Sequence, residues 1–420
     1  MIRSSAGVRP EATPPRLSKQ AGTAADARRR IRAGEHTGHT AGEAVRTCDF
    51  LIIGGGIAGA SAAYELSAHG RTIVLEREDA PGYHSTGRSA AQFLESYGSL
   101  VVRRLAKASR PFFDHPPPGF AEHPLLTPRG VMFIARKDQR ERFAAYLAEA
   151  RALVQSVYEM EVSEAVRMVP VLREDYVAAA FVEPHSMDID VHAIHHGYLK
   201  GIATRGGEVV TDAELTRLVR TQGSWVAETR AGAFAAPVVV NAAGAWCDAV
   251  AELAGVRPIG LVPKRRTAFT FDPPDGLDVT GWPLTIDIDE EFYFKPEAGR
   301  ILASPADETP SPPCDAQPEE IDVARAVDRV HTATTLDVRR ITHRWAGLRS
   351  FVSDNTPVVG MDDEAEGFFW LAGQGGYGIM TSPAMARAAT GLATSGRLPD
   401  DLIALGLTPA ELSPGRLRAT

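Results

Sequence analysis

The chain has 420 residues, of which 44% are hydrophobic and 23% charged, a composition typical of a folded globular protein with room for two or three domains. Its 45 basic and 53 acidic side chains give a net charge of -8, which argues against nucleic acid as a partner. No apolar run reaches the roughly 18 residues of a transmembrane helix. The cysteines are far apart and form no CxxC motif, so we expect no disulfide framework, no zinc site and a cytoplasmic location.

The first 46 residues differ in composition from the rest. They are rich in Ala, Gly, Thr, Pro and Arg and contain no aromatic residue and no apolar run. A secretory or twin-arginine signal requires an apolar stretch of about 7–15 residues after its charges, and a transit peptide is poor in acids, unlike this segment. We therefore predict a disordered tail over residues 1–46, or a start assigned too early, with true initiation nearer Val45.

The folded part begins with a dinucleotide-binding signature. Residues 50–53 form a continuous apolar run, as in a parallel strand that is buried on both faces. A GxGxxG motif follows over residues 54–59, then a helix-like segment, a second apolar strand over residues 72–75 and Glu76. In this fingerprint the glycines allow a tight turn, close approach of a pyrophosphate and close helix–strand packing, and the acid accepts hydrogen bonds from ribose hydroxyls.

Two later segments repeat the pattern of a buried strand that ends in small residues. One is Val238–Trp246. The other is Phe368–Gly378, and it precedes an Ala-rich helix with Ser382 as the expected N-cap and Pro383 as its first residue. The polar loop over residues 77–90 also differs from a plain nicotinamide-binding unit, which continues quickly into another strand and helix. Three such elements predict one discontinuous domain that wraps around a long cofactor.

These motifs resemble the superfamily of FAD enzymes that contains D-amino-acid oxidase, glycine oxidase and sarcosine oxidase. The resemblance rests on the fingerprint, on Asn241–Trp246 and on Gly375–Gly378, and it covers nearly everything from Cys48 to the C-terminus. Within the superfamily, five segments are similar to bacterial FAD-dependent D-arginine dehydrogenase: Pro81–Ala91, Glu122–Leu126, Pro263–Arg266, Phe292–Pro296 and Trp345–Phe351.

The resemblance implies an α/β fold with a discontinuous, Rossmann-like FAD-binding domain and a substrate domain that has a mainly antiparallel β-sheet. We expect the FAD-binding domain over residues 47–95, 186–260 and 340–420. The substrate-binding domain is expected over residues 96–185 and 261–339.

The implied cofactor is FAD, bound without a covalent link because residues 340–360 contain no Cys. The expected cofactor-binding residues are Gly54, Gly56, Ile57, Ala58, Gly59, Glu76, Arg77, Ser85, Thr86, Arg88, Ser89, Ala90, Ala243, Gly244, Trp246, Gly375, Gly376, Tyr377, Gly378 and Ile379.

The expected catalytic residues are two arginines and two tyrosines. Oxidation of a Cα–H bond by a flavin requires a fixed substrate carboxylate, and the planar fork of Arg matches a carboxylate bidentately. Arg349 and Arg266 resemble the arginines that clamp this carboxylate in D-arginine dehydrogenase. A structural ion pair for Arg349 and an exposed basic turn for Arg266 are the alternatives. Tyr293 resembles an active-site wall residue, and Tyr97 resembles a residue on the loop that closes over the substrate.

The side-chain pocket departs from the D-arginine pattern. The position of the acid that recognises the cationic side chain is Val131 here, and a guanidinium without its carboxylate loses roughly 1.5–3 kcal/mol or more. Met380 replaces a Gln near the flavin, and Leu284 and Ile286 alternate along a probable strand at pocket positions. We therefore expect a neutral side chain on the substrate. A cationic side chain stays an alternative, with Glu95 as the acid that would recognise it.

The expected reaction is oxidative deamination of a D-amino acid. Hydride moves from Cα to flavin N5, and water hydrolyses the imino acid to a 2-oxo acid and ammonia. Three alternatives stay open: an O2-dependent oxidase of a secondary amine or N-methyl amino acid, a natural-product tailoring flavoenzyme, and a flavin-binding protein without turnover. The electron acceptor (a quinone or O2) and the oligomeric state are left open.

A cluster of histidines gives no metal site in this interpretation. His192, His195 and His196 share a helix face, as metal ligands do. The stretch reads better as an amphipathic helix with Asp190 as its N-cap, so we expect no metal.

Overall fold

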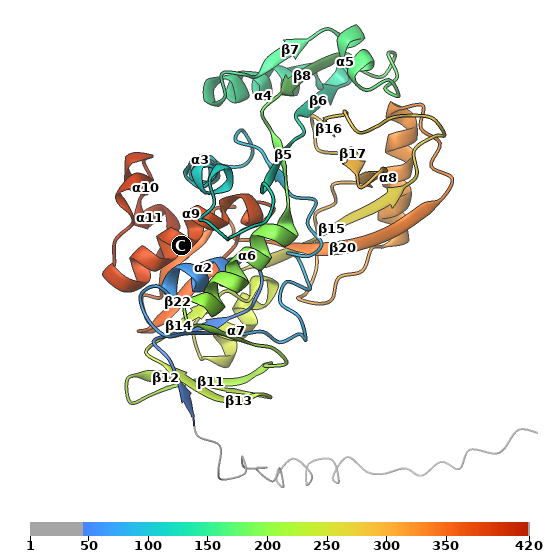
Figure 1. Ribbon diagram of the computed structural model, residues 1–420. Coiled ribbons are helices and arrows are strands. Elements are labelled where there is room, and N and C mark those ends of the chain that lie inside the picture. Colours follow the sequence, from blue (N-terminus) through green and yellow to red (C-terminus); the bar gives the residue numbers. More distant parts are fainter. Residues whose placement is uncertain (1–44, 419–420) are drawn as a thin grey trace, which may run out of the picture. The chain divides into compact units, whose positions relative to one another are not determined.

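The computed structural model describes residues 45–418, so the predicted tail over residues 1–46 lies outside the described residues except for its last two positions. Within residues 45–418 the strands form four β-sheets (Figure 1).

A six-stranded sheet contains the predicted buried strands. In spatial order it consists of β10 (Glu208–Val210), β3 (Thr72–Leu75), β2 (Phe50–Ile53), β14 (Val238–Asn241), β22 (Phe368–Ala372) and β21 (Val358–Met361). Neighbouring strands pair in parallel, except that β21 and β22 are antiparallel. Every residue of β2, β3 and β22 is buried, as their continuous apolar runs predict.

A larger, mainly antiparallel sheet is the second major element. In spatial order it consists of β19 (Thr309–Pro310), β15 (Val262–Phe271), β18 (Arg300–Ser304), β17 (Tyr293–Glu297), β16 (Leu284–Asp287), β6 (Val131–Ala135), β8 (Ala179–Glu183) and β7 (Tyr158–Met160), and β20 (Ile341–Phe351) also pairs with β15. Only β16 and β6 pair in parallel among the described strands of this sheet.

Two smaller sheets and the helices complete the described part. One sheet has the order β1 (Arg46–Thr47), β13 (Gly232–Ala236), β12 (Ser224–Thr229) and β11 (Leu215–Thr221), and the other β4 (Gln92–Phe93), β9 (Met187–Ile189) and β5 (Leu126–Pro128). The α-helices are α2 (Ile57–Leu66), α3 (Leu100–Asp114), α4 (Arg140–Leu153), α5 (Val162–Met168), α6 (Val191–Thr204), α7 (Cys247–Leu253), α8 (Glu320–Ala333), α9 (Gly378–Ser395), α10 (Asp400–Ala404) and α11 (Pro409–Leu412), and the 3-10 helices are η1 (Lys137–Gln139), η2 (Gly244–Trp246) and η3 (Pro414–Leu417).

The strands of the six-stranded sheet separate two hydrophobic cores. Ile52 and Val74 pack with side chains of α2, α6 and α9, while Leu51 and Ile73 pack with α7 and the β11–β13 sheet. This alternation follows from the two-residue period of a β-strand. Figure 1 shows the same layering, with α2 and α6 on one side of β14 and β22 and the β11–β13 sheet on the other. The sheet is therefore the middle layer of three.

These sheets agree with the predicted fold class, an α/β fold with a parallel cofactor sheet and a mainly antiparallel second sheet. The exact domain boundaries stay a prediction, and β20, assigned to the last FAD-binding stretch, pairs along its length with β15 of the larger sheet. No helix within residues 45–418 has both the length and the apolar character needed to cross a bilayer.

The predicted start of α9 was wrong. The helix begins at Gly378, so Ser382 and Pro383 lie inside it and do not form its N-terminus. Pro383 has no N–H for the carbonyl of Ile379, and the Ser382 hydroxyl donates to that carbonyl instead at 2.9 Å. A proline is tolerated at this position because a neighbouring side chain supplies the missing donor.

Candidate functional site

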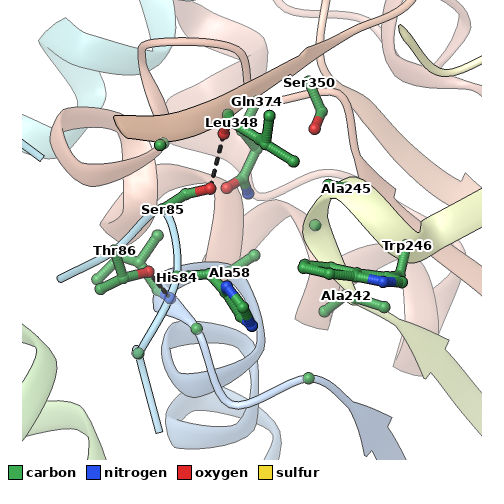
Figure 2. Close-up of a pocket in the computed structure, with 18 of the residues that line it drawn as sticks. Ala58, His84, Ser85, Thr86, Ala242, Ala245, Trp246, Leu348, Ser350 and Gln374 are labelled. Carbon is green, nitrogen blue, oxygen red and sulfur yellow. Dashed lines mark hydrogen bonds between the residues drawn. The ribbon is translucent and has the colours of Figure 1, made fainter. Parts of the chain in front are cut away.

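A cavity of about 340 Å³ lies where the strands of the six-stranded sheet end (Figure 2). It is lined by residues at the ends of β2, β3, β14 and β22, at the starts of α2 and α9, in the loop over residues 82–90, and on β20. Elongated ligands bind at this edge in folds with a parallel sheet. We call it the first cavity.

The glycine-rich turn at the start of α2 is packed too closely for other residues. Gly54 has a φ of +105°, and a Cβ there would lie 2.6 Å from the carbonyl oxygen of Ala242. A Cβ on Gly59 would lie 1.8 Å from the carbonyl oxygen of Gly54. These contacts explain the tight turn and the close helix–strand packing that the fingerprint predicts.

Glu76 is tied to this turn. Its carboxylate accepts hydrogen bonds from the backbone N–H of Gly55 at 2.8 Å and of Glu78 at 3.0 Å. The side chain is buried but lines the first cavity. A carboxylate oxygen has two lone pairs, so Glu76 keeps acceptor capacity for a ligand hydroxyl.

The N-terminus of α2 faces the first cavity without an acidic side chain. No side chain caps the helix at Gly56, its first turn holds no acid, and the N–H of Ile57 donates to the hydroxyl of Thr86 at 2.9 Å. The positive end of the helix is thus available to an anion such as a phosphate.

The loop over residues 82–90 is fixed to β20 across the cavity. Figure 2 shows the hydroxyl of Ser85 joined to the carbonyl of Leu348, at a distance of 2.6 Å. Arg88 donates to the carbonyl of Ala346 at 3.0 Å. On the other wall, the ring of Trp246 lies 4.7 Å from the ring of His84.

The predicted cofactor-binding residues converge on this cavity. All of them line it except Gly59, which packs beneath the turn, and Tyr377, which lines a second cavity described below. Two buried polar atoms at the lining, Nδ1 of His84 and Nε2 of Gln374, have no hydrogen-bond partner within residues 45–418. Buried polar groups are normally satisfied, so these atoms fit a polar ligand.

Sequence reasoning missed several residues that line the first cavity, among them His84, Ala213–Leu215, Ser350 and Gln374. Gln374 and Ser350 each lie next to a predicted residue, so including the residues that flank each motif would have identified them. Ala213–Leu215 follow the short strand β10, which has no continuous apolar run and gave no signal.

Arg349 lies on β20, its backbone pairs with β15, and it lines the first cavity, but its guanidinium forms no hydrogen bond or ion pair with any described residue. It is half-buried. Burial acts to lower the pKa of Arg349, but the neighbouring Tyr97, Tyr293 and Glu290 outweigh it and raise the pKa, so the guanidinium stays charged. A structural ion pair, the alternative for this residue, has no partner in the described part of the chain.

Arg266 also lines the first cavity, and the exposed basic turn considered for it is wrong, because its exposed fraction is 8%. Its Nε donates to the carbonyl of Asp307 at 2.9 Å and its Nη2 to Glu308 at 3.1 Å. Glu308 also pairs with Lys264 at 2.8 Å. Arg266 is thus partly neutralised, whereas Arg349 is not.

The tyrosines lie on two adjoining cavities. Tyr293 lines the first, and Tyr97 lines a second cavity of about 550 Å³ that also contains Arg266 in its wall. The ring of Tyr97 lies 5.2 Å from that of Tyr377 in an edge-to-face contact, and its hydroxyl donates to Glu290 at 3.5 Å. Burial raises the pKa of Tyr97, so the phenol is neutral.

Glu290 is an acid of the second cavity that sequence reasoning missed. It lines this cavity and forms no ion pair with a described residue. Glu95, the acid named from the sequence, is paired with Arg110 at 3.7 Å and lines neither cavity. The only sequence signal for Glu290 is its place three residues before Tyr293.

The apolar positions of the expected side-chain pocket form a wall behind the tyrosines. Val131 is fully buried and packs in one cluster with Leu284, Ile286, Tyr97 and Tyr293. Val131 lines neither cavity.

The histidine cluster forms the predicted helix. It lies on α6, and Asp190 caps that helix by accepting from the N–H of Ala193 at 2.8 Å. The ring of His195 is buried, and its Nε2 lies 2.8 Å from the carbonyl oxygen of Gly55 in the glycine-rich turn.

Known proteins resemble this chain over most of its length. Hydrogen cyanide synthase subunit HcnC of Pseudomonas aeruginosa is 26% identical over 417 residues, which cover 88% of this chain and 95% of that protein. Glycine oxidase of Geobacillus kaustophilus is 24% identical over 383 residues, which cover 87% and 95%.

Solved structures show the same fold. The structure of L-proline dehydrogenase from P. horikoshii has a TM-score of 0.77 and 21% identity, and it covers 89% of this chain and 99% of its own. The glycine oxidase structure from Geobacillus kaustophilus has a TM-score of 0.75 and 22% identity, with 87% and 99% covered.

A family model settles the relationship. The model of the DAO family, described as FAD dependent oxidoreductase, matches residues 49–392. This match confirms the superfamily and the FAD cofactor that the sequence motifs implied. The turn, the carboxylate of Glu76 and the lining of the first cavity fit that cofactor. The chain belongs to the DAO family of FAD-dependent oxidoreductases.

Proposed function

We propose that this protein oxidises the Cα–N bond of a D-amino acid with a neutral side chain. The product is an imino acid, which water hydrolyses to a 2-oxo acid and ammonia. A cytoplasmic location and a quinone or O2 as electron acceptor are parts of the same proposal.

FAD is assigned to the first cavity. The turn over residues 54–59, Glu76, Thr86 and Trp246 would hold it, together with the starts of α2 and α9. When bound there, FAD supplies the two-electron acceptor for the oxidation of a C–N bond. The uncapped start of α9 adds a positive helix end to the same cavity.

The unpaired guanidinium of Arg349 carries the proposal. A half-buried cation with five N–H donors favours acceptors, and none of the described residues accepts a hydrogen bond from it. A substrate carboxylate would satisfy two of these donors bidentately and fix Cα next to the cofactor. Tyr293 lines the same cavity and would orient the substrate from the side.

The neutral side chain and the D configuration have separate support. Val131, Leu284 and Ile286 form the apolar cluster behind Tyr97 and Tyr293, and with Val131 in place of an acid this cluster offers no carboxylate to a cationic side chain. The D configuration is supported by the similarity of five segments to D-arginine dehydrogenase. Glu290 is the described acid that would recognise a cationic side chain, since Glu95 is paired with Arg110.

A secondary amine is the second candidate substrate. It is favoured by the fold match to an L-proline dehydrogenase, whose named substrate is a cyclic secondary amine. Arg349 would hold the carboxylate of such a substrate equally well. A natural-product tailoring reaction stays within this second candidate.

Anaerobic flavin reduction tests the proposal. The visible absorbance of the holoenzyme is followed with D and L forms of Leu, Met, Phe and Arg, and with proline and N-methylglycine. We expect bleaching by D-Leu, D-Met or D-Phe and weak bleaching by D-Arg. Bleaching by secondary amines alone would replace the first candidate with the second, and silence across the panel would refute both. Peroxide formation on admitting O2 separates an oxidase from a dehydrogenase.

A further inference from the structure

The segment over residues 92–97, which ends in Tyr97, is bound along its inner side to the end of β8. The hydroxyl of Ser96 donates to Oε2 of Glu183 at 2.5 Å, and the backbone N–H of Glu95 donates to Oε1 of Glu183 at 3.2 Å. Both oxygens of one carboxylate thus bind two consecutive residues of the segment. We call residues 92–97 the Tyr97 segment.

A second contact holds the other half of the Tyr97 segment. Ser186, in the turn between β8 and β9, accepts from the side-chain amide of Gln92 at 2.9 Å and donates to the carbonyl of Phe93 at 2.9 Å. Ser186 is also buried. Four hydrogen bonds that involve side chains, together with the β4–β9 pairing, therefore attach the segment to one short stretch of chain that lies 87 or more residues away in sequence.

Glu183 is a buried carboxylate without a cation. Its exposed fraction is 2%, that of Ser96 is 1%, and no Lys or Arg side chain within residues 45–418 pairs with it. The hydrogen bonds from Ser96 and Glu95 are its stabilising contacts. If the segment moved away, the carboxylate would lose both of these donors and would need water or a proton in their place.

We infer that Glu183 is a positioning residue that holds Tyr97 over the substrate side of the two cavities. Ser96 and Tyr97 are neighbours in the chain, so the position of the Tyr97 ring against Tyr377 and Glu290 depends on the bond to Glu183. Movement of the segment during substrate entry requires these bonds to break together. This inference rests on the proposed function, because it takes the substrate to lie between Arg349 and Tyr293 of the first cavity and Tyr97 of the second.

Hydrogen exchange of the holoenzyme tests, without turnover, whether Glu183 holds the Tyr97 segment in place. We expect Glu183→Ala to lower the protection of the Glu95 amide by about tenfold or more, as the loss of a charged acceptor implies. Glu183→Gln keeps one acceptor oxygen and should lower it less. Glu159→Gln, an exposed change on β7 beside β8, is the matched control and should leave the protection unchanged. Unchanged protection in Glu183→Ala with full flavin content would overturn the inference.

Ser96→Ala tests the same contact from the opposite partner, in case Glu183→Ala does not fold. We expect it also to lower the protection of peptides that cover residues 92–97. With any substrate that bleaches the flavin, Glu183→Ala and Ser96→Ala should raise KM more than they lower kcat, and Glu183→Gln should recover part of the loss. Equal KM values in wild type and both alanine variants would contradict the role.

The two proposals fail in different ways. If no amino acid or amine bleaches the flavin but the protection changes as expected, the proposed function is refuted and the positioning role of Glu183 is supported. If a D-amino acid bleaches the flavin while protection and KM are unaffected in both alanine variants, the positioning role of Glu183 is refuted and the proposed function is supported.

Discussion

Replacement of Arg349 by Ala gives the sharpest test of the proposed substrate site. The guanidinium has no partner in the described part of the chain, so a carboxylate would meet it without a competing acceptor. Loss of one partner of a buried, hydrogen-bonded charge pair costs about 2–5 kcal/mol. Because Arg349 is half-buried, we expect the lower part of this range, about 2–3.5 kcal/mol. At about 1.4 kcal/mol per factor of ten, kcat/KM should fall roughly 30- to 300-fold.

The same change should have little effect on stability. A side chain that binds no other described residue contributes no hydrogen bond to the fold, and its removal relieves the desolvation of a charge. We therefore expect the Tm of Arg349→Ala to stay at or above that of the wild type. Arg349→Lys keeps the charge but not the fork and should lose about tenfold in kcat/KM. Arg344→Ala, an exposed change on the same strand, is the control and should be neutral in both measurements.

Stopped-flow flavin reduction under anaerobic conditions gives kcat/KM for the chemical half-reaction, and thermal unfolding of the holoenzyme gives Tm. The reasoning would be refuted by a kcat/KM for Arg349→Ala within about threefold of the wild type. A Tm several degrees lower would show that the Arg349 side chain stabilises the fold, which contradicts this reasoning.

Three further predictions concern the cofactor, the second cavity and the C-terminus. Glu76→Ala removes the acceptor of two backbone N–H groups at the turn, so FAD should dissociate about tenfold more readily or worse, as measured by ultrafiltration and free flavin fluorescence. Glu290→Gln should leave kcat/KM for D-Leu within about threefold of the wild-type value and lower any activity on D-Arg, because it removes the acid that has no ion-pair partner among the described residues. A large loss of kcat/KM on D-Leu would contradict this. Burial acts to raise the pKa of Asp362, but hydrogen bonds from Arg418 and Trp370 outweigh it and lower that pKa. Because the folded pKa is the lower one, the stabilisation is present above the unfolded pKa of about 3.9 and is lost as pH falls through the folded value. Asp362→Asn should therefore lower Tm at pH 7 and differ progressively less from the wild type in more acidic buffers.

Local sequence patterns predicted the parts of the fold that local physics determines. The strands β2, β3, β14 and β22 were recognisable because a strand buried on both faces is almost entirely apolar, Asn241 at the end of β14 being the one strongly polar residue of these four apart from Thr72. The start of α9 was not, because Ser382 and Pro383 form a standard helix-start pattern. What overrides that pattern is the Ser382 hydroxyl, which satisfies the carbonyl that Pro383 leaves free.

The same division applies to the site. The residues predicted to bind the cofactor lie within a few positions of a glycine turn or a strand end, so their spacing in the chain fixes their place at the cavity. Glu183 and Glu290 gave no such signal, because Glu183 contacts Ser96 at a separation of 87 residues and Glu290 contacts Tyr97 at a separation of 193. The sequence also did not indicate that the guanidinium of Arg349 would be free to bind a ligand while that of Arg266 is paired, since this depends on which acids contact each guanidinium in the fold.

The pairing of charges around the two cavities supports an amino acid over a simple amine. Glu308 binds both Lys264 and Arg266, so its single negative charge neutralises these two cations in part before a ligand arrives. Arg349 and Glu290 are left without ion-pair partners within residues 45–418, and Glu290 helps to raise the pKa of Arg349. A simple amine offers nothing to a free guanidinium, whereas the carboxylate of an amino acid does. A carboxylate-free amine that bleached the flavin as fast as its amino-acid analogue would therefore count against the proposed substrate class, even if Arg349→Ala were inactive.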